Sequence, residues 1–427
     1  MLDHGIHNRR GRSRWRSRSI SRGRVIAHFE RSRMMAADQA MRALKNDPDF
    51  QAELLSQLLA FKRPEERFGS LDELMERNRI STLLLTSRLS IQEVAAVPAF
   101  GKGAQHFVIY RRDHDEIKFL EETEDGNGEH LRELASVLRD ANQCVAVEEH
   151  GLTADLAAEL GIERHLQDFS AWSDNLRTWR CELSALDVPY TIVAAKIAAG
   201  AIDRTLAKAE SELRSGKTVT AGGVAEYLQD QFKQCCRELI MENDAGYVKA
   251  AHVRISSGGL GSYSPLPPDY AFGPGDQSIM VHGGIHLVEK DGTLRATSDI
   301  GRTLILDPSV EELYTAMERI VTDDLSIACH TNARGRDVYL AGIAALNERR
   351  EVLQTMESEY EGEFGYLADK LRVRDHEFTK DSVYIMDSGL TGAIGMRGMA
   401  GSCRLLYRDM FATHPYQGLN ISRRHPF

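Results

Sequence analysis

The fold of the second half of this 427-residue chain is decided by two stretches, Gly273-Pro-Gly-Asp-Gln-Ser-Ile-Met-Val-His-Gly-Gly (273–284) and Ser298-Asp-Ile-Gly-Arg-Thr-Leu (298–304). They lie within two β-rich segments, 277–289 and 294–306. Lys290-Asp291-Gly292 stands between the segments, and an Asp-Gly pair in this position is a strong signal for a hairpin turn. We therefore predict two antiparallel strands joined by a tight turn.

Two pairs of helices are predicted on either side of this β-rich region. Helical patterns cover residues 192–213 and 221–241 before it, and residues 310–327 and 336–356 after it. The two pairs have similar lengths and similar linkers, which indicates an internal structural repeat. Antiparallel strands flanked by paired helices predict an α+β domain over residues 190–427.

The sequence before this domain shows a different pattern of hydrophobic residues. Short apolar runs of the buried-strand type alternate with helical patterns over residues 34–165, which predicts a smaller α/β domain. Residues 166–189 lose clear periodicity and contain Trp172 and Trp179. We expect this segment to be the linker between the domains, with both tryptophans packed at the junction.

The charge of the chain is unevenly distributed. Residues 1–33 hold ten arginines and only Asp3 and Glu30 as acids, which gives this segment a net charge of +8. Because the formal net charge of the whole chain is −10, residues 34–427 carry −18. An acidic body argues against a nucleic-acid surface. The tail has the composition of a nucleic-acid arm or a targeting peptide, but Met34 and Met35 follow it, as they would after a misassigned start. We expect residues 1–33 to be disordered.

Composition also indicates the compartment. No apolar run approaches the roughly 20 residues of a membrane span. The six cysteines show no CxxC spacing, and no apolar segment near the N-terminus has the form of a secretory signal. We expect a cytoplasmic protein with reduced thiols and no membrane partner.

The order of elements in the second half resembles the pita-bread fold of the creatinase, prolidase and aminopeptidase P family (M24). Residues 273–284 are similar to the family's Pro-Gly-Asp stretch, which leads into the strand with its first metal-binding aspartate. Residues 298–304 are similar to the next strand, which reads Ser-Asp-Ile-Thr-Arg-Thr. The resemblance covers most of residues 70–427 and implies a creatinase-type N-terminal domain and a homodimer.

The resemblance also implies where the site lies. The family's metal site uses two aspartates, a histidine and two glutamates around a pair of divalent ions. Asp299 matches the second aspartate, whereas His282 stands at the first and His414 at a glutamate. The ligand histidine matches Gly392 or Ala393. One of five ligands survives, so a standard dimetal peptidase is not expected.

The remaining polar residues suggest two kinds of site. If His282, Asp299 and His414 converge, two histidines and a carboxylate would suit one zinc or ferrous ion. Without a metal, a histidine oriented by Asp299 would act as a general acid–base. Alternatively, these groups would only line the pocket inherited from the family and hydrogen-bond to one another. Further candidates for substrate binding are His286, on the strand of His282, and the possible carboxylate ligands Arg302 and Arg397.

Three functions remain open at this point. The first is an enzyme that hydrolyses a C–N bond in a small amino-acid-derived or amide-type substrate at a metal-free or mononuclear site. The second is a catalytically inactive module that binds a peptide or protein in the inherited cleft, as peptidase-like domains of histone chaperones do. The third is an Xaa-Pro-type metallopeptidase with atypical ligands. Fold analogy alone does not identify a substrate.

Overall fold

The protein is described by a computed structural model that divides into two compact units, each considered separately below. The described residues are 14–31, 66–95, 106–112, 114–123, 135–136, 144–148, 158, 169–239, 247–258, 263–288, 294–349, 364–367, 375–387, 389–400 and 403–422.

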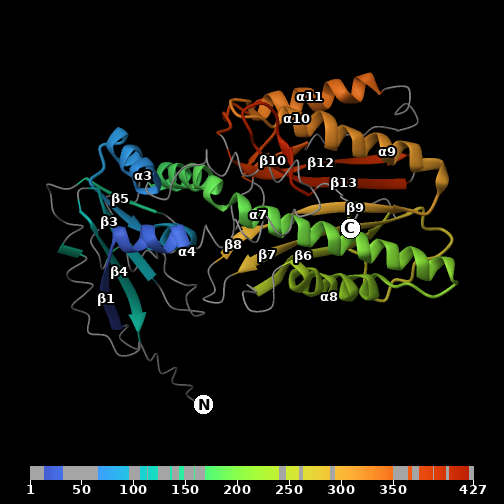
Figure 1. Ribbon diagram of the computed structural model, residues 1–427, viewed down its shortest axis with the longest axis horizontal. Coiled ribbons are helices and arrows are strands. Elements are labelled where there is room, and N and C mark those ends of the chain that lie inside the picture. Colours follow the sequence, from blue (N-terminus) through green and yellow to red (C-terminus); the bar gives the residue numbers. More distant parts are fainter. Residues whose placement is uncertain are drawn as a thin grey trace, which may run out of the picture. The chain divides into compact units, whose positions relative to one another are not determined.

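The N-terminal unit contains a five-stranded mixed sheet with the order β1-β4-β3-β2-β5 (Figure 1). Its strands are β1 (Arg14–Ser21), β2 (Thr82–Leu85), β3 (His106–Arg111), β4 (Glu116–Thr123) and β5 (Val145–Val147). Strands β2 and β5 are parallel and the other neighbours are antiparallel. Helices α3 (Glu66–Arg77) and α4 (Arg88–Ala95) belong to the same unit, so strands and helices occur together as predicted.

Part of the arginine-rich segment differs from its expected disorder, whereas residues 1–13, 32 and 33 lie outside the described residues. Arg14–Ser21 forms β1 and pairs with β4 along its whole length. In this stretch arginine alternates with tryptophan and serine, and this period of two is the pattern of a strand. The guanidinium of Arg18 lies 4.6 Å from the centre of the Phe119 ring on β4. The alternation typical of a strand is present here, but its alternating residues are charged arginines instead of hydrophobic residues.

The expected linker is also different, because residues 169–189 lie within the long helix α7 (Phe169–Arg214). The boundary between the two units falls inside this helix, after Trp179. Trp172 and Trp179 are both buried, and Nε1 of Trp179 donates to Oγ of Ser70 on α3 at 3.1 Å. Trp179 therefore packs within the N-terminal unit.

The C-terminal unit is built on a large antiparallel sheet, with the order β11-β10-β12-β13-β9-β7-β6 and with β8 and β14 paired to β7 and β13. Its strands are β6 (Tyr247–Ser257), β7 (Ser278–Val288), β8 (Leu294–Thr297), β9 (Ile300–Ile305), β10 (Gly365–Leu367), β11 (Asp375–Glu377), β12 (Thr391–Ala400), β13 (Cys403–Ala412) and β14 (Leu419–Asn420). The antiparallel pairing of β7 with β8 confirms the predicted hairpin, although its turn lies outside the described residues.

Helices accompany this sheet in the two pairs that the sequence predicts (Figure 1). The first pair is α7 with α8 (Ala221–Leu239). The second pair consists of α9 (Glu311–Arg319), which continues through a π-helical turn (Ile320–Leu325) into α10 (Ser326–Ala328), and α11 (Gly335–Glu348). A short 3-10 turn (Pro308–Val310) precedes α9.

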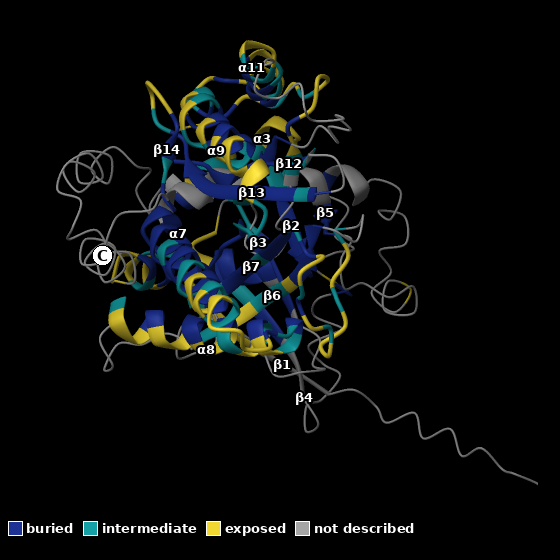
Figure 2. Ribbon diagram, turned by 90° about the vertical axis from the view of Figure 1, so that its right-hand side faces the viewer, coloured by how far each residue is buried: buried dark blue, intermediate teal, exposed yellow. Residues whose placement is uncertain are grey.

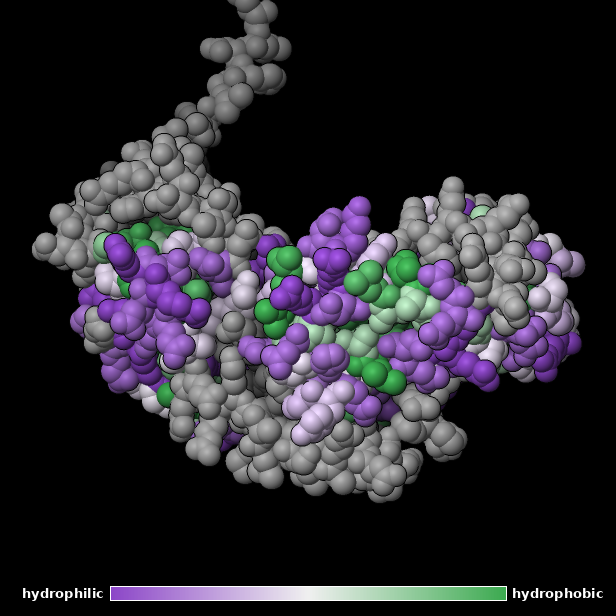
Figure 3. Space-filling model, turned by 90° about the horizontal axis from the view of Figure 1, so that it is seen from above, coloured by the Kyte–Doolittle hydropathy of each residue, from purple (hydrophilic) through white to green (hydrophobic). Residues whose placement is uncertain are grey.

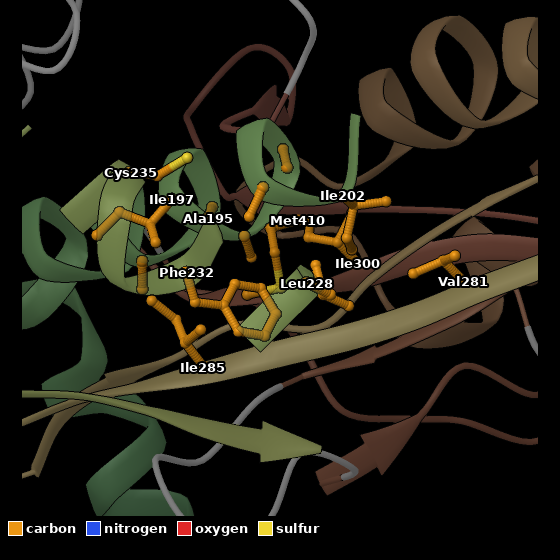
Figure 4. Packing of buried hydrophobic residues seen from close by; sticks show 14 of the residues in the cluster. Ala195, Ile197, Ile202, Leu228, Phe232, Cys235, Val281, Ile285, Ile300 and Met410 are labelled. Carbon is orange, nitrogen blue, oxygen red and sulfur yellow. The ribbon is translucent and has the colours of Figure 1, made fainter. Parts of the chain in front are cut away.

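The core determines which face of β7 carries the site. Ile279, Val281 and Ile285 of β7 are buried in one cluster with Leu228 and Phe232 of α8 (Figure 4). Because side chains alternate along a strand, the residues between them, including His282, face away from these helices. In Figure 2 the strands β7 and β13 are largely buried, whereas helices α8, α9 and α11 carry exposed residues.

The surface of the described part is mainly polar. The face seen in Figure 3 carries hydrophilic side chains with hydrophobic ones in small groups between them. The exposed large hydrophobic residues are Ile327, Leu340, Val383, Ile385 and Tyr416. None of the helices in the described ranges combines the length and hydropathy that a membrane span needs.

Candidate active site

The centre of the candidate site is the carboxylate of Asp299, which lies in the connection between β8 and β9. Its side chain is 3% exposed, and its two oxygens have different partners. Oδ1 contacts Nε2 of His282 in a short hydrogen bond and Nε2 of His252 at 3.0 Å. The two imidazole rings meet edge to face, with centroids 4.8 Å apart. One carboxylate oxygen therefore binds two histidines from two strands.

The strand register explains how His252 reaches this point. On β6 the pairing passes from Ala250, opposite Ile285, to His252, opposite Gly284, so Ala251 is an extra residue in a β-bulge. Bulges commonly re-aim a side chain next to a functional site. A Cβ atom at Gly284 would lie 2.8 Å from Cε1 of His252. Glycine at 284 therefore leaves room for the His252 ring.

Oδ2 of Asp299 is held by two further strands. Nη1 of Arg408 on β13 donates to it at 2.9 Å, and the hydroxyl of Tyr366 on β10 makes a short hydrogen bond. Arg408 is 3% exposed, and the Tyr366 ring lies 5.5 Å from its guanidinium. A carboxylate offers about four acceptor positions, so these partners and the two histidines use its full capacity.

The surroundings fix the charges of the buried groups. Burial lowers the pKa of His282 to about 4, although the Asp299 charge opposes this effect, so the imidazole is neutral at pH 7. Burial alone would raise the pKa of Asp299, but the charges of protonated His282 and of Arg408, together with hydrogen bonds from both histidines, hold it well below its ordinary value. The site at neutral pH contains an ionised carboxylate, a guanidinium and a neutral His282.

The hydrogen bonds also assign a chemical role to His252. An ionised carboxylate only accepts, so the imidazole must donate to it through Nε2. Nδ1 is then the basic nitrogen of a neutral His252. Its side chain is 21% exposed, compared with 11% for His282 and 3% for Asp299. His252 is therefore the member of this group that is best placed to exchange a proton with a bound molecule.

The predicted convergence of three residues is only partly found. His282 and Asp299 lie together, but the third member of the cluster is His252 rather than His414. His414 follows the end of β13, where its carbonyl accepts a hydrogen bond from the amide of Thr331. The centre of its ring lies 5.7 Å from the centre of the Tyr416 ring. Since β13 ends at Ala412, His414 lies beyond the strand that carries Arg408, and it is not a member of the cluster.

The two predicted substrate arginines have different environments. Arg302 is completely buried and forms an ion pair with Asp409. Its guanidinium is therefore bound inside the protein and does not face a ligand. Arg397 on β12 is partly exposed, and its guanidinium lies 5.0 Å from the centre of the Tyr263 ring. His286, the third predicted binding residue, is partly buried and pairs through Nδ1 with Oγ1 of Thr297 at 2.9 Å.

Solved structures with the same arrangement include several peptidases. The chain matches an Xaa-Pro dipeptidase from Bacillus anthracis with a TM-score of 0.60 and 13% identity, covering 85% of this chain and 98% of that one. It matches the prolidase from Pyrococcus furiosus with a TM-score of 0.57 and 11% identity, covering 83% and 100%. This is the pita-bread fold. No family model and no curated protein matches the sequence.

The same pita-bread fold occurs in a protein of another kind. The N-terminal domain of FACT complex subunit SPT16 from Cicer arietinum (chickpea) matches with a TM-score of 0.61 and 11% identity, over 84% of this chain and 95% of that one. At identities this low the likeness establishes the fold alone. The chemistry must be argued from the side chains.

The side chains of this pita-bread unit do not fit a pair of metal ions. A dinuclear centre needs several anionic ligands to bridge and neutralise two cations. Within the described ranges the cluster contributes one carboxylate, Asp299. The Arg408 guanidinium, held against that carboxylate, adds a positive charge. At about 4 Å and an effective dielectric constant of about 20, a unit charge repels a divalent ion by roughly 8 kcal/mol.

Proposed function

We propose that this protein is a hydrolase of C–N bonds in small, amide-type substrates, with His252 and Asp299 as its acid–base pair. The observation that supports this proposal most strongly is the 3.0 Å contact between His252 Nε2 and Asp299 Oδ1 at the more exposed side of a buried cluster. A carboxylate that orients a partly exposed imidazole is a recurring arrangement for moving protons. The pita-bread peptidases provide the analogy for the reaction class.

Besides the amide substrate, the proposed reaction consumes one water molecule and no other reactant. Nδ1 of His252 accepts a proton from water as the water oxygen forms a bond to the carbonyl carbon. The tetrahedral intermediate then loses its C–N bond, and the imidazolium of His252 returns the proton to the departing nitrogen. The products are a carboxylic acid and an amine. Asp299 keeps the ring in place and stabilises its protonated form.

The arginines on the neighbouring strands favour a substrate with an anionic group. On β13, Arg404 and Arg408 lie an even number of residues apart and therefore share a face of the sheet. Arg397 pairs with Leu406, which lies between them, and so projects on the same face. The guanidinium groups of Arg397 and Arg404 each lie 5.0 Å from the Tyr263 ring. We propose that Arg397 binds a carboxylate of the substrate.

The experiment is a screen of small amides, N-acyl amino acids and dipeptides, with amine release as the readout. We expect His252→Gln to lower kcat by about 100-fold or more, as loss of a general base does. His286→Gln is the matched control, since His286 lies on the adjacent strand and outside the cluster. Arg397→Met should raise KM for the anionic substrate with little change in kcat. Equal activity of wild type and His252→Gln would refute the proposal.

A peptide-binding module without catalysis is the second candidate. The similarity to the SPT16 domain supports it, because this FACT complex subunit shares the fold with a TM-score of 0.61, compared with 0.60 for the dipeptidase from Bacillus anthracis. The two candidates differ in one result. A module of this kind would bind a peptide with the same affinity in wild type and in His252→Gln, and would release no amine from any member of the panel.

A further inference from the structure

The Arg408 side chain begins between two neighbouring strands that both carry a glycine beside it. Its neighbours on the adjoining strands are both glycines, Gly301 on β9 and Gly395 on β12. A Cβ atom at Gly301 would lie 3.3 Å from Cβ of Arg408, and one at Gly395 would lie 2.8 Å from it. Side chains of ordinary size on either strand would displace the arginine. The two glycines thus provide the space that the base of this side chain occupies.

The far end of Arg408 is held just as closely. Nη1 donates to Oδ2 of Asp299 at 2.9 Å and lies 3.5 Å from Nε2 of His282. The guanidinium therefore stands beside two of the three groups, His252, His282 and Asp299, whose ligand atoms lie within 4.8 Å of one another. Among the described residues, these three form the one group that could hold a mononuclear metal.

We infer that Arg408 is the permanent cation of this site and excludes divalent metal ions from the His252, His282 and Asp299 cluster. The charges support this inference. The guanidinium of Arg408 already neutralises the carboxylate of Asp299, so this pair contributes no net negative charge to attract a cation. A divalent ion would bring two positive charges into a buried space beside the guanidinium, with only one anionic ligand to offset them.

This inference concerns the same site as the proposed hydrolase but does not depend on it, because its test measures metal binding rather than turnover. Wild type and Arg408→Met are titrated calorimetrically with zinc and with manganese, and their melting temperatures are followed in parallel. We expect wild type to show no saturable binding at this cluster. Removal of the charge in Arg408→Met should raise the affinity for zinc by about 100-fold or more.

Two controls make the result specific. Arg404→Met removes an arginine four residues along the same strand and on the same face, and should leave metal binding as in wild type. His252→Ala combined with Arg408→Met should abolish the gained affinity, because one of the three ligands is lost. Arg408→Lys keeps the positive charge if Arg408→Met fails to fold, and should bind no metal.

The inference is overturned by either of two outcomes. One is that wild type binds one equivalent of a divalent ion and loses it in His252→Ala. The other is that Arg408→Met folds, as its melting curve would show, yet gains no affinity for zinc or manganese. Gained binding that disappears in the double variant supports the inference.

Discussion

Nη1 of Arg408 lies 2.9 Å from Oδ2 of Asp299, and each of the two side chains is 3% exposed. A second buried pair joins Arg302 of β9 to Asp409, the residue after Arg408 on β13. Since neighbouring residues on a strand face opposite sides, Arg408 points to the site and Asp409 to the helix-covered face. The two ion pairs thus have separate roles.

The second pair predicts a large effect on stability. Asp409→Ala would leave the guanidinium of Arg302 buried without its carboxylate, which costs about 3–5 kcal/mol of unfolding free energy. Unfolding in urea measures this loss. Glu210→Ala is the control, because Glu210 and Arg214 form an exposed pair in which the arginine is 79% exposed. It should change the stability by less than about 1 kcal/mol. Similar losses in both variants would contradict the role assigned to Asp409.

The packing around Arg408 predicts that Gly395 does not tolerate a side chain. The Cβ atom of Gly395→Ala would lie 2.6 Å from the carbonyl oxygen of Tyr407 and would also press on Arg408. We expect a loss of about 1–3 kcal/mol in the free energy of unfolding. Gly273→Ala is the matched control, because a Cβ atom at Gly273 meets nothing within 4 Å. A Gly395→Ala variant as stable as wild type would show that the strands are further apart than described.

The lowered pKa of His282 predicts acid sensitivity. The unfolded chain binds a proton at His282 below about pH 6.5, whereas the folded protein binds it only near pH 4. Between these values the unfolded state holds more protons, so stability falls as the pH falls. The loss amounts to at most about 3 kcal/mol. His282→Gln should flatten the dependence of the unfolding free energy on pH in this range, and an unchanged slope would show that another group is responsible.

The sequence predicts much of the fold because its signals are local. The β7–β8 hairpin, the strands around Asp299 and the two helix pairs all have short-range patterns, and the described strands and helices agree with them. The structure differs from the disorder expected at residues 14–21 and from the linker expected at residues 169–189, because Arg14–Ser21 pairs with β4 and residues 169–189 are helical. Arginine and tryptophan in these segments obscured a strand and a helix, respectively, that gain their stability from packing.

The site is less predictable because it is assembled from distant strands. The resemblance to the M24 family points to His282 and Asp299, whereas His252, Tyr366 and Arg408 come from three further strands and share no spacing with them. A weak signal exists in retrospect, since His252 faces a glycine and Arg408 faces glycines on both sides. Reading that signal requires the register, which the sequence alone does not provide.

The choice among the arginines illustrates the same limit. Arg302 and Arg408 differ in role because they face opposite sides of paired strands, and a shift of one residue in the register of either strand would put both on the same side. His414 lies beyond the end of β13 at Ala412, and the cluster in the described residues contains His252 in its place.

The most direct measurement of the central claim is the anomalous diffraction of crystals of the wild-type protein grown with a zinc salt. We expect no anomalous peak among His252, His282 and Asp299, with the Arg408 guanidinium within hydrogen-bonding distance of the carboxylate. A strong peak among these three side chains, with Arg408 turned away from Asp299, would contradict the account.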